Sequence, residues 1–174
     1  MRTTDLADPT SWRAWDGTGF DVQFVNPYLE TDESPQKHIC QPVSYDEIGL
    51  MVESLTFNTY FNRFLLVGTA TAQDRSRSKV GSEGDAVSGI YYSLSDDLIN
   101  WTPRKLIMEV ETRSSYQCGD PNPIAYPSVI DPESSSQNFE TTGKQVYVYF
   151  TRFNYESCQE TQDRDLVRVP IEFS

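Results

Sequence analysis

The sequence predicts an all-β protein, and three observations lead to this prediction. Short runs of aromatic and β-branched residues recur along the 174 residues, separated by clusters of Gly, Pro, Asn, Asp and Ser, a pattern typical of strands and turns. No stretch keeps the periodicity of a helix for three turns. Aromatic residues make up 13% of the chain, too many for a disordered protein despite a mean hydropathy of −0.54.

The order of the predicted strands indicates a repeat. These strands span Phe20–Val25, Leu50–Phe57, Arg63–Ala70, Ser88–Ser93, Arg104–Val110, Ile124–Ile130, Gln145–Arg152 and Asp165–Phe173. The second to the fifth form two hairpins, separated by a polar loop over residues 73–85. Four antiparallel strands in series make one blade of a β-propeller. The last three strands form a second, three-stranded unit.

We therefore expect a single domain over residues 1–174 with about two and a half blades. Residues 12–30 would be the remnant of a preceding blade, 45–111 a complete blade and 116–174 the last blade. Propeller blades bury their faces against their neighbours. Such a piece leaves two faces open, so it needs the missing part of the ring, a second copy or a remodelled edge.

Composition excludes several classes of partner. The net charge is −12 and the 14 basic residues are scattered, which disfavours binding to nucleic acid. No run approaches the roughly 18 apolar residues that cross a bilayer, and the N-terminus does not resemble a signal peptide. Neutral ligands such as sugars remain compatible with this charge.

The cysteines and the single histidine do not predict a metal site. Cys40, Cys118 and Cys158 lack the spacing of zinc ligands, and His38 lies in a polar loop. We therefore assign no residue to a metal and expect no cofactor. The sequence has no compact Asp/Asn ligand loop, which leaves calcium binding undecided. The odd number of cysteines allows at most one disulfide within the chain and leaves the redox compartment open.

Two motifs carry a resemblance to a known family. The first is Ser95–Thr102, with the sequence SDDLINWT, which follows the strand GIYYS. The second comprises Tyr126–Asp131, Tyr147–Asn154 and Asp163–Phe173. In this order the motifs resemble the C-terminal part of the five-bladed propellers of glycoside hydrolase family 43, which includes arabinanases and xylosidases. The resemblance covers about residues 45–174, and members of the family are commonly secreted.

The first motif also resembles the Asp box of sialidases, without its glycine and one residue shorter. We interpret it as a turn in which Ser95 and Asp97 bind backbone groups and Trp101 packs over the hairpin. The alternative is that Trp101 is a platform for sugar stacking. Asn100-Trp101-Thr102 is formally a glycosylation sequon, which we interpret as a chance match.

The resemblance does not extend to the catalytic machinery. Family 43 enzymes invert, and inversion requires two carboxyl groups roughly 6.5–9.5 Å apart. The blades that would carry the base and the orienting aspartate are outside this chain, so no residue here receives those roles. The resemblance therefore implies a carbohydrate-active fragment that is not hydrolytic on its own.

The substrate pocket of a propeller lies at one mouth of its channel, near the starts of the innermost strands. Of the side chains expected there, Glu53 is the candidate general acid, because burial in an apolar strand would favour its protonated form; the alternative is a paired strand residue. The others are substrate-binding candidates: Asp120, Asn122, Tyr126, Arg152 and Asn154, with Tyr45, Asp46, Glu47 and Tyr116 also near the mouth. The alternatives are that Asp120 shapes a turn and that Arg152 forms an ion pair.

Three functions remain open at this stage. The chain is the C-terminal half of a hydrolase, a non-catalytic module that binds glycans or proteins, or a homodimer that recloses the ring. The expected ligand is an oligosaccharide or polysaccharide, and the expected protein partner is a second copy of the chain or the missing half of the propeller.

Overall fold

The computed structural model describes residues 1–26, 28–29, 34–71 and 87–174. The chain divides into two compact units, Met1–Val43 and Ser44–Ser174, where the sequence predicted one domain. The first unit closes on itself, since the Gln41 N–H donates to the Trp15 carbonyl at 2.8 Å. The long loop predicted over residues 73–85 lies outside the described residues.

The residues described in the first unit form two short 3-10 helices, η1 (Pro9–Ser11) and η2 (Pro35–His38), and two strands, β1 (Arg13–Ala14) and β2 (Val22–Gln23). The strands pair antiparallel, with Ala14 opposite Val22, and both of these side chains are buried. The predicted strand Phe20–Val25 is therefore present over two residues only. Its interpretation as a blade remnant stays a prediction.

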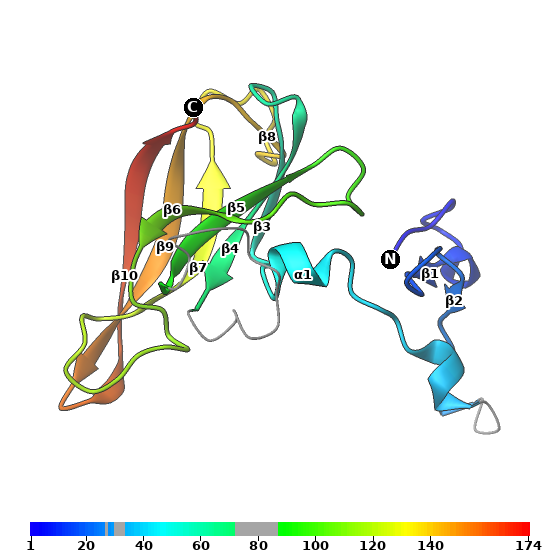
Figure 1. Cartoon of the computed structure of the whole chain (residues 1–174), viewed down its shortest axis with the longest axis horizontal. Coiled ribbons are helices and arrows are strands. Elements are labelled where there is room, and N and C mark those ends of the chain that lie inside the picture. The colour runs from blue at the N-terminus through cyan, green and yellow to red at the C-terminus, as the bar shows by residue number, and fades with distance from the viewer. Residues whose placement is uncertain (27, 30–33, 72–86) are drawn as a thin grey trace. The chain divides into compact units, whose positions relative to one another are not determined.

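The described part of the second unit is mostly β, with one short helix, α1 (Tyr45–Ile48). Its strands are β3 (Ser54–Asn58), β4 (Arg63–Ala70), β5 (Gly89–Ser95), β6 (Lys105–Glu109), β7 (Ile124–Ile130), β8 (Thr141–Thr142), β9 (Gln145–Glu156) and β10 (Gln159–Glu172). They form a five-stranded sheet in the order β6-β5-β4-β3-β8 and a three-stranded sheet in the order β10-β9-β7. The result is a curled, half-barrel-like arrangement (Figure 1).

The two predicted strand sets are confirmed as sheets. Strands β3 to β6 pair antiparallel in series, as do β7, β9 and β10. Strand β8 is an addition, which pairs parallel to β3 and places Thr142 beside Asn58. There the Asn58 side-chain amide donates to the Gly143 carbonyl at 2.8 Å, a buried polar link between the β3 and β8–β9 segments.

Several strand boundaries differ from the prediction for local reasons. Strand β3 begins at Ser54 rather than Leu50, because Gly49 ends α1 with a φ of 61° and Met51 then packs against β4 at Gly68. Strands β9 and β10 run on into a hairpin, whose turn residues Ser157 and Cys158 both have positive φ.

The core lies between the two sheets. It contains nine buried apolar residues, which are Leu65, Val67, Ile90, Ile124, Val129, Val146, Val148, Phe150 and Phe173. Side chains alternate between the two faces of a strand, so Leu65 and Val67 face this core while Leu66 and Gly68 lie on the other face of the five-stranded sheet.

That other face is covered by the chain itself. Ile48, Met51, Trp101 and Arg104 are all buried, and they come from the α1 segment and from the segment that leads into β6. The burial of Trp101 confirms the prediction that its side chain packs against the protein. One face that a propeller fragment would leave open is thus occupied here by residues around α1.

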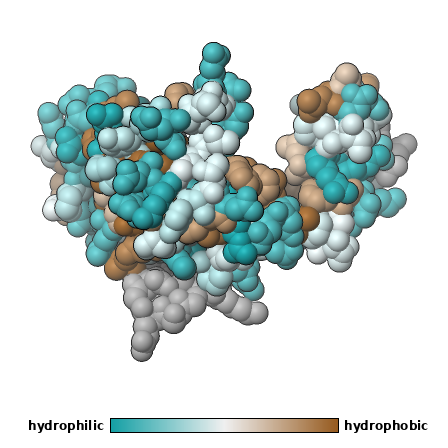
Figure 2. Space-filling view, turned by 90° about the horizontal axis from the view of Figure 1, so that it is seen from above, coloured by the Kyte–Doolittle hydropathy of each residue, from teal (hydrophilic) through white to brown (hydrophobic). Residues whose placement is uncertain are grey.

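The visible surface of each unit carries apolar residues among more numerous polar ones (Figure 2). Scattered apolar side chains of this kind are normal on a folded protein. Among the described residues, no helix is long and apolar enough to span a membrane.

Candidate functional site

A hollow of about 510 Å³ opens where β3 and β7 begin and β4 ends. Its lining combines aliphatic, aromatic, hydroxyl and charged side chains, namely Val52, Glu53, Thr69, Thr112, Arg113, Ser114, Ile124, Ala125 and Tyr126. Two of the predicted site residues, Glu53 and Tyr126, are therefore brought to one place by strands that are far apart in the sequence.

Strand β4 holds the Glu53 carboxylate in position. Oε1 accepts hydrogen bonds from the Thr69 backbone N–H at 3.0 Å and from the Thr69 hydroxyl at 2.6 Å. Oε2 accepts from the Val52 N–H at 2.9 Å. Gly68 makes this approach feasible, since a Cβ at that position would collide with Oε2 and lie 2.9 Å from the Met51 Cβ.

Tyr126 offers the exposed aromatic surface of the hollow, with 60% of its area accessible. It lies at an irregularity in the pairing of β7 with β9, and its φ is 59°, in the left-handed region that non-glycine residues rarely adopt. The next residue, Pro127, is fully buried, and the Tyr126 ring lies 6.0 Å from the ring of Phe153. The backbone at Tyr126 is therefore strained, and the surrounding structure fixes the position of its side chain.

Arg113 forms the charged side of the hollow. Its guanidinium lies over the Phe153 ring, 4.9 Å from the centroid, and pairs with Glu160 at 2.8 Å. Arg164 lies over the same ring at 4.7 Å and pairs with the same carboxylate at 2.9 Å.

The charges in this cluster stabilise one another. Proximity to the Glu160 carboxylate raises the pKa of Arg113. Desolvation opposes ionisation of Glu160, but the hydrogen bond from Arg164 and the charge of Arg113 outweigh it and lower its pKa. Arg113 and Glu160 are therefore charged at neutral pH. Phe153 is completely buried beneath the guanidinium groups of Arg113 and Arg164.

Three other predicted residues lie together in a separate hydrogen-bonded row. The Asn122 amide donates to the Asn154 side-chain oxygen at 3.0 Å, and the Asn154 amide donates to Asp163 at 2.9 Å and to Asp165 at 3.2 Å. Arg152 completes the row with two hydrogen bonds to Asp165, the shorter at 2.7 Å. These bonds from Arg152 and Asn154 lower the pKa of Asp165.

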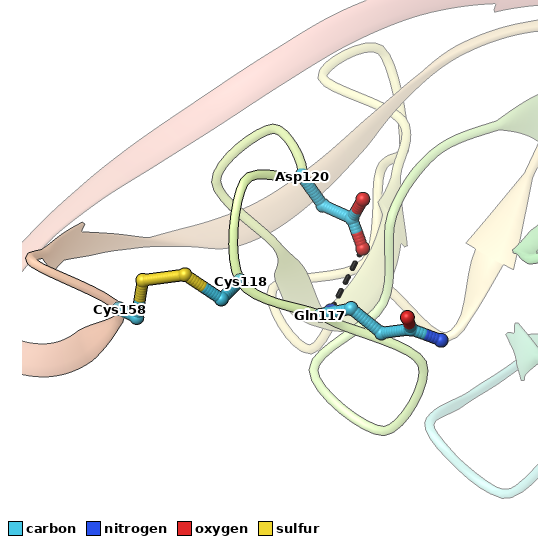
Figure 3. Close-up of a disulfide and its surroundings, with 4 residues drawn as sticks. All are labelled: Gln117, Cys118, Asp120 and Cys158. Atoms are coloured by element: carbon cyan, nitrogen blue, oxygen red, sulfur yellow. Dashed lines mark hydrogen bonds between the residues drawn. A yellow bond between two sulfur atoms is a disulfide. The ribbon is translucent and has the colours of Figure 1, made fainter.

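Asp120 shapes a turn, as the alternative interpretation held. Its Oδ2 accepts from the Gln117 N–H at 2.7 Å, and its own N–H donates to the Gln117 carbonyl at 3.0 Å. Figure 3 shows this turn beside the Cys118–Cys158 disulfide, which ties the loop to the tip of the β9–β10 hairpin. Cys40 is free and exposed, so the three cysteines give one disulfide and one thiol.

A second hollow, of about 720 Å³, lies on the other side of Ile124. Asn122 lines it together with Glu109 and Glu111, Val87, Ser88, Val110 and Pro121. None of these described lining residues is aromatic. The exposed ring of Tyr126 therefore distinguishes the first hollow from the second.

The remaining candidates lie elsewhere. Tyr45, Asp46 and Glu47 form most of α1 and do not line either hollow. The Tyr116 ring lies 4.2 Å from that of Tyr155. His38 belongs to the first unit.

The segment Ser95–Thr102 forms a turn. The Asp97 carboxylate accepts from the N–H groups of Asn100 at 2.7 Å and Ile99 at 2.9 Å. These hydrogen bonds hold the pKa of Asp97 at about 2, so the carboxylate is ionised over the whole physiological range.

Sequence reasoning missed Thr69, Arg113, Phe153 and Glu160. Thr69 lies within a predicted strand and Phe153 directly follows one, whereas Arg113 and Glu160 lie between predicted strands. None of the four therefore carries a local signal. Their role follows only from the way the two sheets meet. Among the described residues, no group of three or more His, Cys, Asp or Glu side chains is placed to hold a metal ion.

No protein-family model matches the chain, and no curated protein or solved structure is significantly similar to it. The chemistry of the hollow therefore rests on its own residues. It offers one aromatic face, hydroxyl groups, one guanidinium and one carboxylate. This combination suits binding of a neutral polyhydroxylated ligand.

Proposed function

We propose that this chain binds carbohydrate in the hollow lined by Glu53, Arg113 and Tyr126, and that it does not hydrolyse its ligand alone. The observation that carries the proposal is the Tyr126 ring, 60% exposed at the edge of a hollow with fixed polar groups. An apolar or aromatic surface with a few oriented polar groups is the usual composition of a small-molecule site.

The polar groups complement sugar hydroxyls. The C–H face of a pyranose or furanose ring packs against an aromatic ring, and its hydroxyls both donate and accept hydrogen bonds. Glu53 is an acceptor, Arg113 a donor, and the Ser114 hydroxyl is both. A glycan docked on Tyr126 would therefore find partners of each kind within the lining.

Glycoside hydrolysis needs a pair of carboxyl groups. Among the described residues that line the hollow, Glu53 is the one carboxylate. We accordingly assign Glu53 to ligand binding, and we keep the resemblance to glycoside hydrolase family 43 as an indication of ancestry.

Glycan binding tests this function, with Tyr126→Ala as the decisive variant. We expect it to weaken binding at least tenfold on a glycan array and by calorimetry, because stacking is lost without a change in the core. Tyr60→Ala is the matched control, since Tyr60 is also about half exposed, at 48%, but follows the opposite end of β3. Equal binding by both variants would contradict the proposal.

Aryl arabinofuranosides and xylosides test the absence of hydrolysis. We expect no turnover by the isolated chain. Turnover that disappears in Glu53→Gln would show that Glu53 is an acid catalyst and that the non-catalytic part of the proposal is wrong.

A further inference from the structure

Arg104 is a buried arginine in the second unit, outside both hollows. It is 3% exposed, and its backbone N–H donates to the Glu47 carbonyl at 3.3 Å. Its guanidinium carbon lies 5.4 Å from the centroid of the Tyr91 ring. The side chain is therefore enclosed between the five-stranded sheet and the α1 segment.

The guanidinium lacks the hydrogen-bond acceptors that a buried cation needs. Nε and Nη1 are both buried without a partner, and so is Nε1 of Trp101, three residues earlier on the same segment. The Trp101 backbone N–H donates to the Ser44 hydroxyl at 3.1 Å, so both residues pack against the start of the α1 segment. Within the described part of residues 44–174, these three atoms are the buried side-chain nitrogens and oxygens without a partner, and all three are donors.

Gly49 lets the guanidinium of Arg104 approach the backbone closely. Its φ is 61°, and a Cβ at this position would lie 2.9 Å from Nη1 of Arg104. Any other residue would therefore press on the guanidinium as well as strain the backbone. The absence of a side chain at residue 49 therefore lets the guanidinium lie against the backbone after α1.

A set of buried donors with a positive charge calls for a negatively charged acceptor. Burial of an unpaired charge is strongly unfavourable, and the Tyr91 ring compensates only part of that cost. A water molecule would accept the hydrogen bonds but leave the charge unbalanced, whereas a cation would be repelled. We propose that a small monatomic anion, of the size of chloride, binds to Arg104 between the five-stranded sheet and the α1 segment.

The size of the anion follows from the enclosure. Because Arg104 is almost fully buried, a sugar acid or an organic phosphate has no access without displacing α1. The site is independent of the Tyr126 hollow, so either proposal stands if the other fails.

Thermal unfolding of the full chain tests this site with sodium chloride as the probe. Chloride replaces gluconate at constant sodium concentration, so that screening of the net charge of −12 stays the same. A ligand that binds only the folded state raises Tm, and we expect a rise of roughly 4 °C for each tenfold increase in chloride once the site begins to fill. A Tm that does not depend on chloride would overturn the proposal.

Arg104→Met separates the site from general salt effects. This variant replaces the charge by an apolar side chain, so we expect its Tm to be independent of chloride. In gluconate it should equal or exceed the Tm of the wild type, because no unpaired charge remains buried. The matched control is Arg168→Met, which removes an exposed arginine whose guanidinium also lies over a tyrosine, Tyr147, at 4.7 Å; it should keep the full chloride response.

A direct measurement covers the case in which Arg104→Met does not fold. Broadening of the ³⁵Cl NMR line by the wild-type protein reports bound chloride, and we expect bromide to compete for it. Arg104→Lys keeps the charge but loses the guanidinium, so it should weaken the broadening at least tenfold. Undiminished broadening in Arg104→Lys, or none in the wild type, would contradict the assignment to Arg104.

Discussion

The hydrogen-bonded row and the hollow lie on opposite sides of strand β9. Both contain polar residues that the sequence marked as candidates, but they differ in which side chains remain free to bind a ligand. Arg152 and Asn154 point into the hydrogen-bonded row, where each is bonded to Asp165. Phe153, between them, is buried and supports Tyr126 and Arg113 at the edge of the hollow. Adjacent residues on one strand thus serve opposite sides of it.

The difference teaches that clustering of polar residues is a weak sign of a site. In the row, the side chains satisfy one another and hold the β9–β10 hairpin together. In the hollow, the Glu53 carboxylate is fixed by Thr69, yet the ring of Tyr126 remains exposed. Side chains that the fold holds in place, but that keep an exposed surface or spare hydrogen-bonding capacity, are the ones available to a ligand.

Phe153→Ala should break the hollow and has the largest expected effect. Phe153 is completely buried, and removal of such a ring costs about 3–5 kcal/mol of unfolding free energy. Both guanidinium groups and Tyr126 lose the surface beneath them, so glycan binding should disappear as well. Urea denaturation and calorimetry measure the two effects.

The control for this variant is Phe150→Ala. Phe150 is a core residue of the same strand and is 5% exposed. Unlike Phe153, it makes no ring contact with Tyr126 and no cation–π contact with Arg113. We expect similar destabilisation with glycan binding retained below the unfolding transition. Loss of binding in both variants would mean that the hollow depends on overall stability and not on Phe153.

Removal of the Cys118–Cys158 disulfide should affect the row more than the hollow. The cysteines are 40 residues apart in sequence, and closing a loop of this length contributes about 2–4 kcal/mol. The double variant Cys118→Ser/Cys158→Ser should unfold at a lower urea concentration while still binding glycan at low temperature.

The control is Cys40→Ser, at the exposed free thiol, which should change the unfolding free energy by less than about 0.5 kcal/mol. A larger change would point to a role for Cys40 that the structure does not show.

The sheets were largely predictable because period-2 patterns and turn residues are local. Arg63–Ala70 and Ile124–Ile130 were predicted with the bounds that the structure has. The region 50–53 was not, because Leu-Met-Val reads as a strand, whereas Met51 packs across Gly68 through a contact between distant segments. Whether the two sheets are blades of a propeller stays a prediction.

The candidate site was predictable only in part, and for a similar reason. Glu53 and Tyr126 were chosen for their place before or within apolar strands, and they line one hollow. Asn122 and Arg152 were chosen on the same grounds but lie in the row. Only the register between β7 and β9, with its irregularity after Ala125, decides which side chains meet.

Asp165→Asn has the smallest expected effect, and it tests whether the hydrogen-bonded row contributes to stability but not to glycan binding. Hydrogen bonds from Arg152 and Asn154 lower the pKa of Asp165 in the folded state, below the value of about 3.9 in an unfolded chain. Its ionised form therefore stabilises the fold above about pH 4, and this contribution is lost as the pH falls towards the lowered pKa. Wild type and variant should differ slightly in unfolding free energy at pH 6 and converge in acid.

The Arg152–Asp165 pair is about half exposed, so added salt should reduce this difference. Urea titrations from pH 3 to pH 7 measure it, and in an Arg152→Met background the difference should be smaller at every pH. A difference that grew in acid, or glycan binding that fell in Asp165→Asn, would show that the row is part of the binding site.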